Sequence, residues 1–192
     1  MKSSFSILSF KLPIVFGFLL SAQVAFSFSV RLDGAVSQES VRSVMNSISK
    51  HLQSGETEMT LRLESEGGDI PAAVTLANFL RDKSTEGLSV TTYNRAKCNS
   101  ACTIIFAAGK VRKAARGAEF YFHSVGVSGA GKDHDAVQFR WARIWSSQIA
   151  MVDPRLGQEL EEDDILVGQS NERIYKGGRL FDDGYTYVTE LN

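Results

Sequence analysis

Residues able to carry out chemistry concentrate in three short segments of this chain. A serine, Ser100, stands in the segment 98–102 (Cys-Asn-Ser-Ala-Cys), directly before an apolar run that ends at Gly109. A glycine pair, Gly67-Gly68, lies upstream, and an apolar stretch ends at His123 downstream. Serine becomes a nucleophile when a base takes its proton, and the oxyanion of acyl transfer needs backbone N–H donors. The segments together predict a nucleophile, a base and an oxyanion site.

The base is assigned among the three histidines of the chain. His51 lies near the end of an expected polar helix and His134 in a glycine-rich loop, so His123 is the best placed. Gly68 lets the backbone approach a ligand closely, and the N–H of Ala101 lies beside the serine at a helix start. Each feature alone is more often structural, since a serine there is usually a cap. The prediction therefore depends on their order along the chain.

Apolar spacing predicts the elements that position these residues. Alternation favours strands near 28–32, 59–63 and 88–93, with shorter ones at 173–175 and 185–188. Helical spacing favours helices over 37–52, from Asp69 as N-cap, from Ser100 to Gly109, over 135–152 and over 154–166. This β-α-β alternation is typical of an α/β fold with a mainly parallel sheet flanked by helices. Functional sites in such folds gather where strands end, which is where Gly68, Ser100 and His123 fall.

The first 27 residues have the pattern of a secretory signal peptide. Lys2 and Lys11 precede an apolar run that is shorter than the about 20 residues of a membrane span, and Ala25 with Ser27 offers a small-x-small cleavage site. We expect residues 28–192 to form a single domain exported to the bacterial periplasm, with an N-terminal membrane anchor as the alternative. The net charge of −1 gives no support for binding nucleic acid.

The two cysteines, Cys98 and Cys102, allow two interpretations. An oxidising compartment permits a disulfide, and positions four apart can meet its geometry in a helical turn. The alternative is a pair of small buried hydrophobic side chains. No metal-binding or nucleotide-binding motif appears, so we expect no metal or other cofactor. The basic residues between 110 and 116 are interpreted as a solvated turn.

Three segments, 64–69, 98–109 and 122–124, resemble in this order the proteolytic subunit of Clp proteases. The resemblance spans roughly residues 61–188 and is closest to the exported branch with a Cys-x-Ser-Ala-Cys motif. It implies a ClpP/crotonase-like fold of repeated β-α-β units, with Ser100 as nucleophile, His123 as base, and Gly68 and Ala101 as oxyanion donors. It also implies an orienting carboxylate. Glu172 occupies that position, twelve residues before Gly184, where the family has an aspartate.

The resemblance further implies a serine endopeptidase acting on peptides or unfolded proteins. The periplasm holds no ATP pool, so we expect no ATPase partner. Residues 135–152 correspond to the helix through which Clp rings assemble, and Phe139, Trp141 and Trp145 agree with a homo-oligomer. The alternative is that the tryptophans pack on the core of their own chain, as most tryptophans do. One alternative is a catalytically inactive binding or assembly module, favoured by Glu172 and by the missing proline after His123. Another is an acyl-CoA enzyme of crotonase type, which export from the CoA pool disfavours.

Overall fold

The protein is described here from a computed structural model, which covers residues 26–127, 131–167 and 171–192. The predicted signal peptide therefore lies outside the described residues, apart from Phe26 and Ser27. Ser27 is the first residue of a strand, and the carbonyl of Phe26 accepts hydrogen bonds from the N–H groups of Thr57 and Glu58. Within the described ranges, no helix combines the length and the hydropathy needed to cross a membrane.

Seven strands form a sheet that is almost entirely parallel. Its main path runs through β1 (Ser27–Val36), β2 (Glu58–Gly68), β3 (Ser89–Cys98), β4 (Val111–Ala114) and β7 (Glu190–Leu191). Strand β5 (Glu119–Phe122) also pairs with β3 in parallel, and β6 (Arg173–Lys176) pairs with β5 in antiparallel orientation. The prediction of an α/β fold with a mainly parallel sheet flanked by helices is confirmed.

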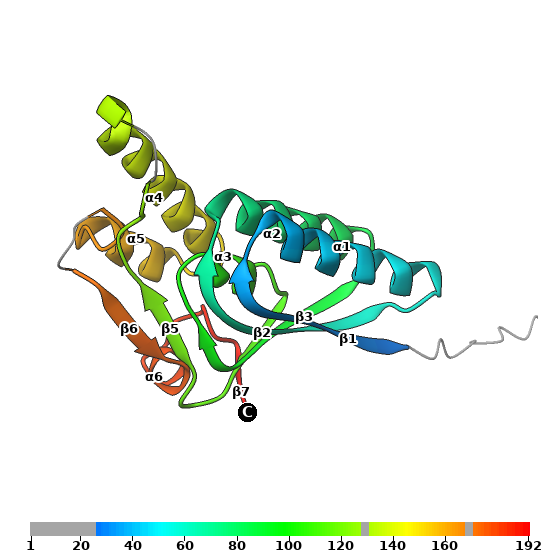
Figure 1. The fold of residues 1–192 in the computed structure, drawn as a ribbon. Coiled ribbons are helices and arrows are strands. Elements are labelled where there is room, and N and C mark those ends of the chain that lie inside the picture. The colour runs from blue at the N-terminus through cyan, green and yellow to red at the C-terminus, as the bar shows by residue number, and fades with distance from the viewer. Residues whose placement is uncertain (1–25, 128–130, 168–170) are drawn as a thin grey trace, which may run out of the picture.

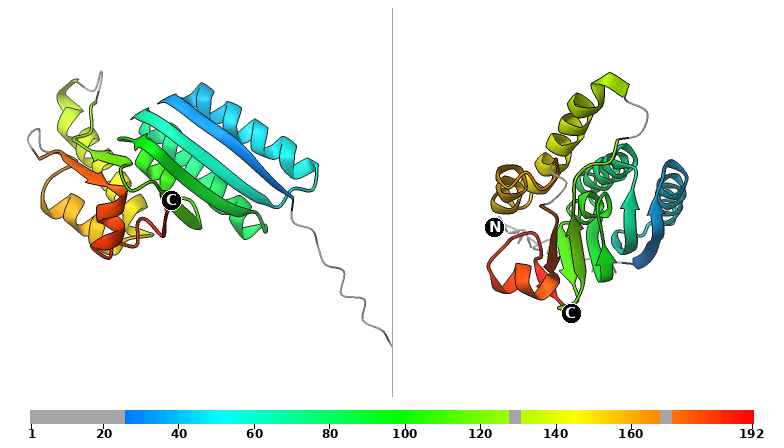
Figure 2. Two further views of the ribbon diagram at one scale, coloured as in Figure 1. Left: turned by 90° about the horizontal axis from the view of Figure 1, so that it is seen from below. Right: turned by 60° about the vertical axis from the view of Figure 1, so that its left-hand side comes forward.

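The helices cover one side of the sheet and one end of the molecule (Figure 1). Helices α1 (Gln38–Gln53) and α2 (Ile70–Thr85) lie side by side over β1, β2 and β3. Helices α4 (His134–Ala150) and α5 (Pro154–Glu162) stand at the other end, near β5 and β6, with a 3-10 turn at Gly131–Asp133 and helix α6 (Gly177–Asp182). The other face of β1, β2 and β3 carries no helix (Figure 2). Their side chains accordingly alternate between buried and exposed, as the two-residue strand period requires.

A helix cap at Asp69 determines where β2 ends and α2 begins. A carboxylate oxygen of Asp69 accepts a hydrogen bond from the N–H of Ala72 at 2.9 Å, and Pro71 occupies the first turn. Both features favour the start of a helix. The cap accepts a hydrogen bond from an N–H group that has no partner within the helix, and proline has no N–H group that would need one. Gly68 is thus held between the end of a strand and the start of a helix.

The basic segment 110–116 departs from the prediction of a solvated turn. Val111–Ala114 is strand β4, and the side chain of Arg112 is buried. Its guanidinium donates to the carbonyls of Gly109 and Thr186 at 2.8 Å and of Tyr187 at 3.0 Å. Burial lowers the pKa of Arg112. These bonds satisfy the carbonyls of the irregular segment 185–188, which was expected to be a strand and is not.

Helix lengths near the C-terminus and after Ser100 were also overestimated. The helix expected to run to Gly109 is the five-residue helix α3 (Cys102–Phe106), and α5 ends at Glu162 rather than near residue 166. Helix α6 was not predicted. Beneath α3 and β5 lies an aromatic cluster in which the Phe106 ring centroid is 4.7 Å from that of Phe120 and 5.1 Å from that of Tyr187. These aromatic contacts join α3, β5 and the segment before β7 in one core.

Candidate active site

Ser100 occupies a tight turn between β3 and α3. Its φ angle is 52°, in the left-handed region, which costs a non-glycine residue about 1–2 kcal/mol. The N–H of Ser100 donates to the carbonyl of Tyr121 at 2.8 Å, and its own carbonyl accepts from the N–H of Thr103 at 2.9 Å. The surrounding contacts therefore hold the serine in an unfavourable backbone conformation, which is common for residues at functional sites.

A disulfide between Cys98 and Cys102 closes this turn. Cys98 is the last residue of β3 and Cys102 the first of α3, and both are fully buried. Of the two interpretations allowed by the sequence, the structure has the disulfide. The bridge ties the strand that ends before Ser100 to the helix that begins after it.

The two glycines at the end of β2 have different roles. Gly67 has φ 92°, and a Cβ added there would lie 2.5 Å from the Cβ of Ser100 and 2.6 Å from the carbonyl oxygen of Asn99. The backbone at Gly67 therefore lies flat against the serine turn, where no side chain fits. Gly68 has φ 143°, packs against the carbonyl of Val36 and lines the pocket that contains Ser100.

Ala101 offers an N–H group beside the serine. The residue is fully buried. The neighbouring N–H groups of Ser100 and Cys102 donate to the carbonyls of Tyr121 and Asn99. Among the described residues, the N–H of Ala101 has no hydrogen-bond partner. A buried N–H is rarely left unpaired, and one beside a nucleophile suits the stabilisation of an oxyanion.

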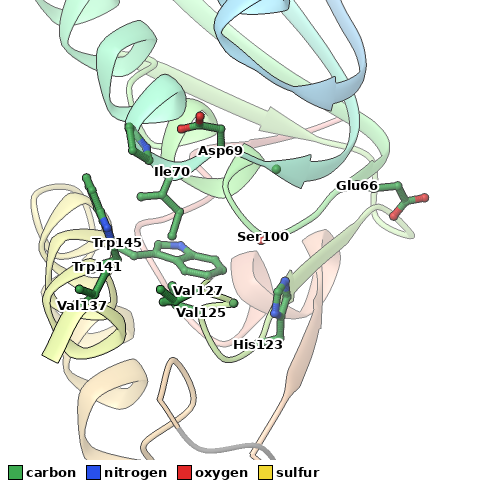
Figure 3. Close-up of a pocket in the computed structure, with 13 residues that line it drawn as sticks. Glu66, Asp69, Ile70, Ser100, His123, Val125, Val127, Val137, Trp141 and Trp145 are labelled. Carbon is green, nitrogen blue, oxygen red and sulfur yellow. The ribbon is translucent and has the colours of Figure 1, made fainter. Parts of the chain in front are cut away.

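His123 follows β5 and points into the same pocket (Figure 3). Its Nδ1 lies 2.7 Å from the carbonyl oxygen of Ser124. A carbonyl oxygen only accepts hydrogen bonds, so Nδ1 carries a proton, and in the neutral ring Nε2 then carries the lone pair. The structure has no hydrogen bond between the side chains of His123 and Ser100, both of which it describes. Such bonds are often long without substrate and shorten in the complex.

Glu172 was expected to hold the imidazole of His123. Among the described residues, no hydrogen bond joins its carboxylate to that ring. Glu172 precedes β6, whose residue Arg173 pairs with Phe122, and its side chain is exposed. The nearby carboxylate of Glu172, together with burial, raises the pKa of Tyr121. In the structure, the backbone carbonyl of Ser124, rather than the expected carboxylate, bonds to Nδ1. The centroid of the Tyr121 ring lies 5.1 Å from that of His123.

The pocket has a volume of about 650 Å³ and an apolar wall. Side chains of α4 form the wall that faces His123 across the pocket (Figure 3). Backbone and side chains near Ser100 form its polar end. The apolar lining residues are Ile70, Val125, Val127, Val137, Trp141 and Trp145. A concave apolar site with a few polar groups is typical of a substrate pocket.

Glu66 lines the polar end of the pocket without being free to react. Its carboxylate binds the ammonium of Lys97 and accepts from Nδ2 of Asn99 at 2.9 Å. These hydrogen bonds, that of Lys97 foremost, lower the pKa of Glu66. The carboxylate therefore stays ionised and helps to hold the segment before Ser100. In the part of the chain that the structure describes, no cluster of three or more His, Cys, Asp or Glu side chains is arranged to hold a metal ion.

Sequence analysis missed two residues that contact the site, Thr103 and Trp145. Thr103 was part of an apolar run, and Trp145 was assigned to a self-association face. The structure buries both completely, with Trp145 on the wall of the pocket. Only their pairing in three dimensions identifies them, because nothing in the spacing of the two residues connects them.

No protein-family model matches the chain, and a search of curated proteins finds no significant match. The fold and the site nevertheless define a structural class for this protein. This is an α/β protein whose mainly parallel sheet presents a serine turn, a histidine and a glycine pair around one pocket. The three sequence segments that predicted a site do come together, at the carboxyl ends of β2, β3 and β5.

Proposed function

We propose that this protein is a serine peptidase that hydrolyses peptides or unfolded proteins. The observation that carries the proposal is the turn of Ser100, held in the left-handed region and in the same pocket as His123. Beside it lies the N–H of Ala101, which has no hydrogen-bond partner among the described residues. The resemblance to the Clp proteolytic subunit agrees with these roles. Hydrolysis by covalent catalysis needs a nucleophile, a base and oxyanion donors, and each has a candidate here.

The position of the proton on the His123 ring determines which ring nitrogen can act as the base. With the proton on Nδ1, the lone pair on Nε2 takes the proton of the Ser100 hydroxyl as its oxygen attacks the carbonyl carbon of the substrate. The negative charge on the substrate oxygen is then stabilised by the N–H of Ala101 and by that of Gly68. Nε2 gives its proton to the leaving amine, and water releases the acyl group from Ser100 by the same steps.

A backbone carbonyl would replace the third member of a triad. The Ser124 carbonyl keeps His123 in the productive tautomer, which is one task of the aspartate in a triad. It carries only a partial negative charge, so it stabilises the imidazolium less than a carboxylate does. We therefore propose a Ser100–His123 dyad in which Glu172 does not bond to the ring.

The pocket favours an apolar substrate side chain. Val137 and Trp141 of α4 and Val125 of the loop after β5 provide a wall without a charged group. Burying an apolar side chain of the size of leucine contributes about 1.5–3 kcal/mol. Peptides with a large apolar residue before the scissile bond are thus the substrates that the site suits best.

Export, self-association and independence from ATP remain part of the proposal. The expected self-association face is smaller than the sequence indicated, because Trp145 is fully buried while Phe139 is 56% exposed. Of the three aromatic residues assigned to that face, Phe139 is the one whose ring is mostly accessible to a second copy.

Fluorophosphonate labelling of the purified protein, followed by intact mass, tests the proposal. We expect one added probe, lost in Ser100→Ala and in His123→Ala. Ser147→Ala is the matched control, since this exposed serine on α4 only donates to the carbonyl of Ile144. Folded protein that does not label, or that labels equally in Ser100→Ala, would refute the proposal.

A binding module without turnover is the second candidate. It is favoured by the lack of a carboxylate on the ring of His123 and of a hydrogen bond from Ser100 to that ring, both within the described residues. In that case, an apolar peptide binds equally well to the wild type and to Ser100→Ala in calorimetry, and neither preparation cleaves it.

A further inference from the structure

One residue of α3, Thr103, fixes the carbonyl of the serine turn. The carbonyl oxygen of Ser100 accepts two hydrogen bonds from Thr103, from its N–H at 2.9 Å and from its hydroxyl at 2.7 Å. Thr103 is fully buried. Because Ser100 has φ 52°, its carbonyl would gain by rotating back to an ordinary conformation. The two bonds oppose that rotation.

Trp145 of α4 holds the threonine hydroxyl. Its indole N–H donates to Oγ1 of Thr103 at 2.8 Å. The hydroxyl has one proton and accepting lone pairs. Since the tryptophan takes a lone pair, the proton is left for the carbonyl of Ser100. The direction of the whole chain of bonds is therefore set by the indole, which can only donate.

Trp145 also touches the histidine. The ring centroids of Trp145 and His123 are 5.9 Å apart and their planes meet at 85°, an edge-to-face contact. Figure 3 shows both side chains on the pocket wall. One buried side chain thus contacts the ring of His123 directly and, through the Thr103 hydroxyl, the backbone of Ser100.

We propose that Trp145 and Thr103 are positioning residues that hold the Ser100 turn and the His123 ring at a fixed separation. The inference rests on the proposed function, in which these two groups exchange a proton. Thr103 does not line the pocket, Trp145 forms part of its wall, and neither residue is one of the reacting groups. Their effect is on the geometry of the pair, and they act as one unit because the indole acts on Ser100 through the threonine hydroxyl.

The test is a double-mutant cycle of Thr103→Val and Trp145→Phe, read by the rate of fluorophosphonate labelling across pH. Valine removes the hydroxyl at nearly constant shape, and phenylalanine keeps an aromatic ring but removes the N–H. We expect each variant to label about five- to ten-fold more slowly, as loss of one neutral hydrogen bond implies. The double variant should label no more slowly than the worse single one, because contacting residues are not additive.

Two further variants separate positioning from stability. Thr103→Ser keeps the hydroxyl and should restore the wild-type rate. Tyr187→Phe removes a hydroxyl that donates to the carbonyl of Thr103 at 2.7 Å but touches neither Ser100 nor the threonine hydroxyl. It should lower the midpoint of urea unfolding while leaving labelling within about two-fold, well under the loss of one hydrogen bond. Additive losses in the cycle, or no rescue by serine, would overturn the inference.

If the wild-type protein does not label, the proposed function is refuted. NMR of the His123 ring then tests separately whether Trp145 and Thr103 position that ring. We then expect the ring nitrogen shifts of His123 to move in Trp145→Phe and in Thr103→Val but not in Tyr187→Phe. Ring shifts that stay unchanged in both site variants, or that move equally in all three, would overturn the positioning as well.

Discussion

Replacing Gly67 by alanine tests whether the backbone of β2 sets the position of the serine. Gly87, which follows α2, is a matched control. Both glycines have positive φ angles, 92° and 108°, but a Cβ at Gly87 would meet nothing within 4 Å. The two alanine variants therefore share the strain of a left-handed backbone, and only one of them forces a contact.

The expected costs follow from this difference. The backbone strain alone destabilises Gly87→Ala by about 1–2 kcal/mol. Gly67→Ala adds a Cβ that would be 2.5 Å from the Cβ of Ser100, whereas carbon atoms pack at about 3.5–4.0 Å. The serine turn must move by about 1 Å, and overpacking of this kind costs a further 1–3 kcal/mol or so. A displacement of that size at a reacting group lowers rates by about 100-fold.

Urea unfolding and fluorophosphonate labelling measure the two effects separately. We expect Gly87→Ala to lose free energy of unfolding and to label like the wild type. Gly67→Ala should lose more free energy and label about two orders of magnitude more slowly. If the two variants unfold and label alike, the close approach of Gly67 to Ser100 does not govern the site, and the structural argument is refuted.

Three other perturbations have defined outcomes. Glu172→Gln should label within about two-fold of the wild type, since His123 is bonded to the carbonyl of Ser124; a drop of about 10⁴-fold, as when a triad carboxylate is lost, would restore Glu172 to a direct role. The double variant Cys98→Ala/Cys102→Ala should lose about 2 kcal/mol of unfolding free energy in urea, the entropy of a five-residue loop, and label more slowly; full activity in the folded variant would exclude the disulfide from positioning Ser100. Tyr175 and Tyr185 should remain protonated in ultraviolet titration up to a pH of about 12, because burial, followed by the charge and hydrogen bonding of Glu159, raises the pKa of both to about 12. Their pKa in the folded protein lies above the ordinary tyrosine value of about 10, so the stability linked to them is complete below pH 10 and is lost as the pH rises through about 12. Titration of both near pH 10 in folded protein would contradict this.

The local pattern of the chain determined most of the elements and the order of the site. Alternating apolar residues, the Asp69 cap and Pro71 are interactions within a few residues of each other, so they act in any environment. For that reason the sequence predicted that Gly68, Ser100 and His123 end three neighbouring segments. It also showed that a disulfide was allowed, because four residues separate Cys98 from Cys102.

The tertiary structure alone decided which groups touch. Arg112 is charged and was expected in water, but the carbonyls of Gly109, Thr186 and Tyr187 offered it buried partners. The indole of Trp145 donates a hydrogen bond to the hydroxyl of Thr103, and the ring of His123 bonds to the carbonyl of Ser124 rather than to Glu172. Each of these choices depends on distances between segments far apart in the chain. The sequence shows which groups can form hydrogen bonds. The packing of the helices and strands determines which partner each group contacts.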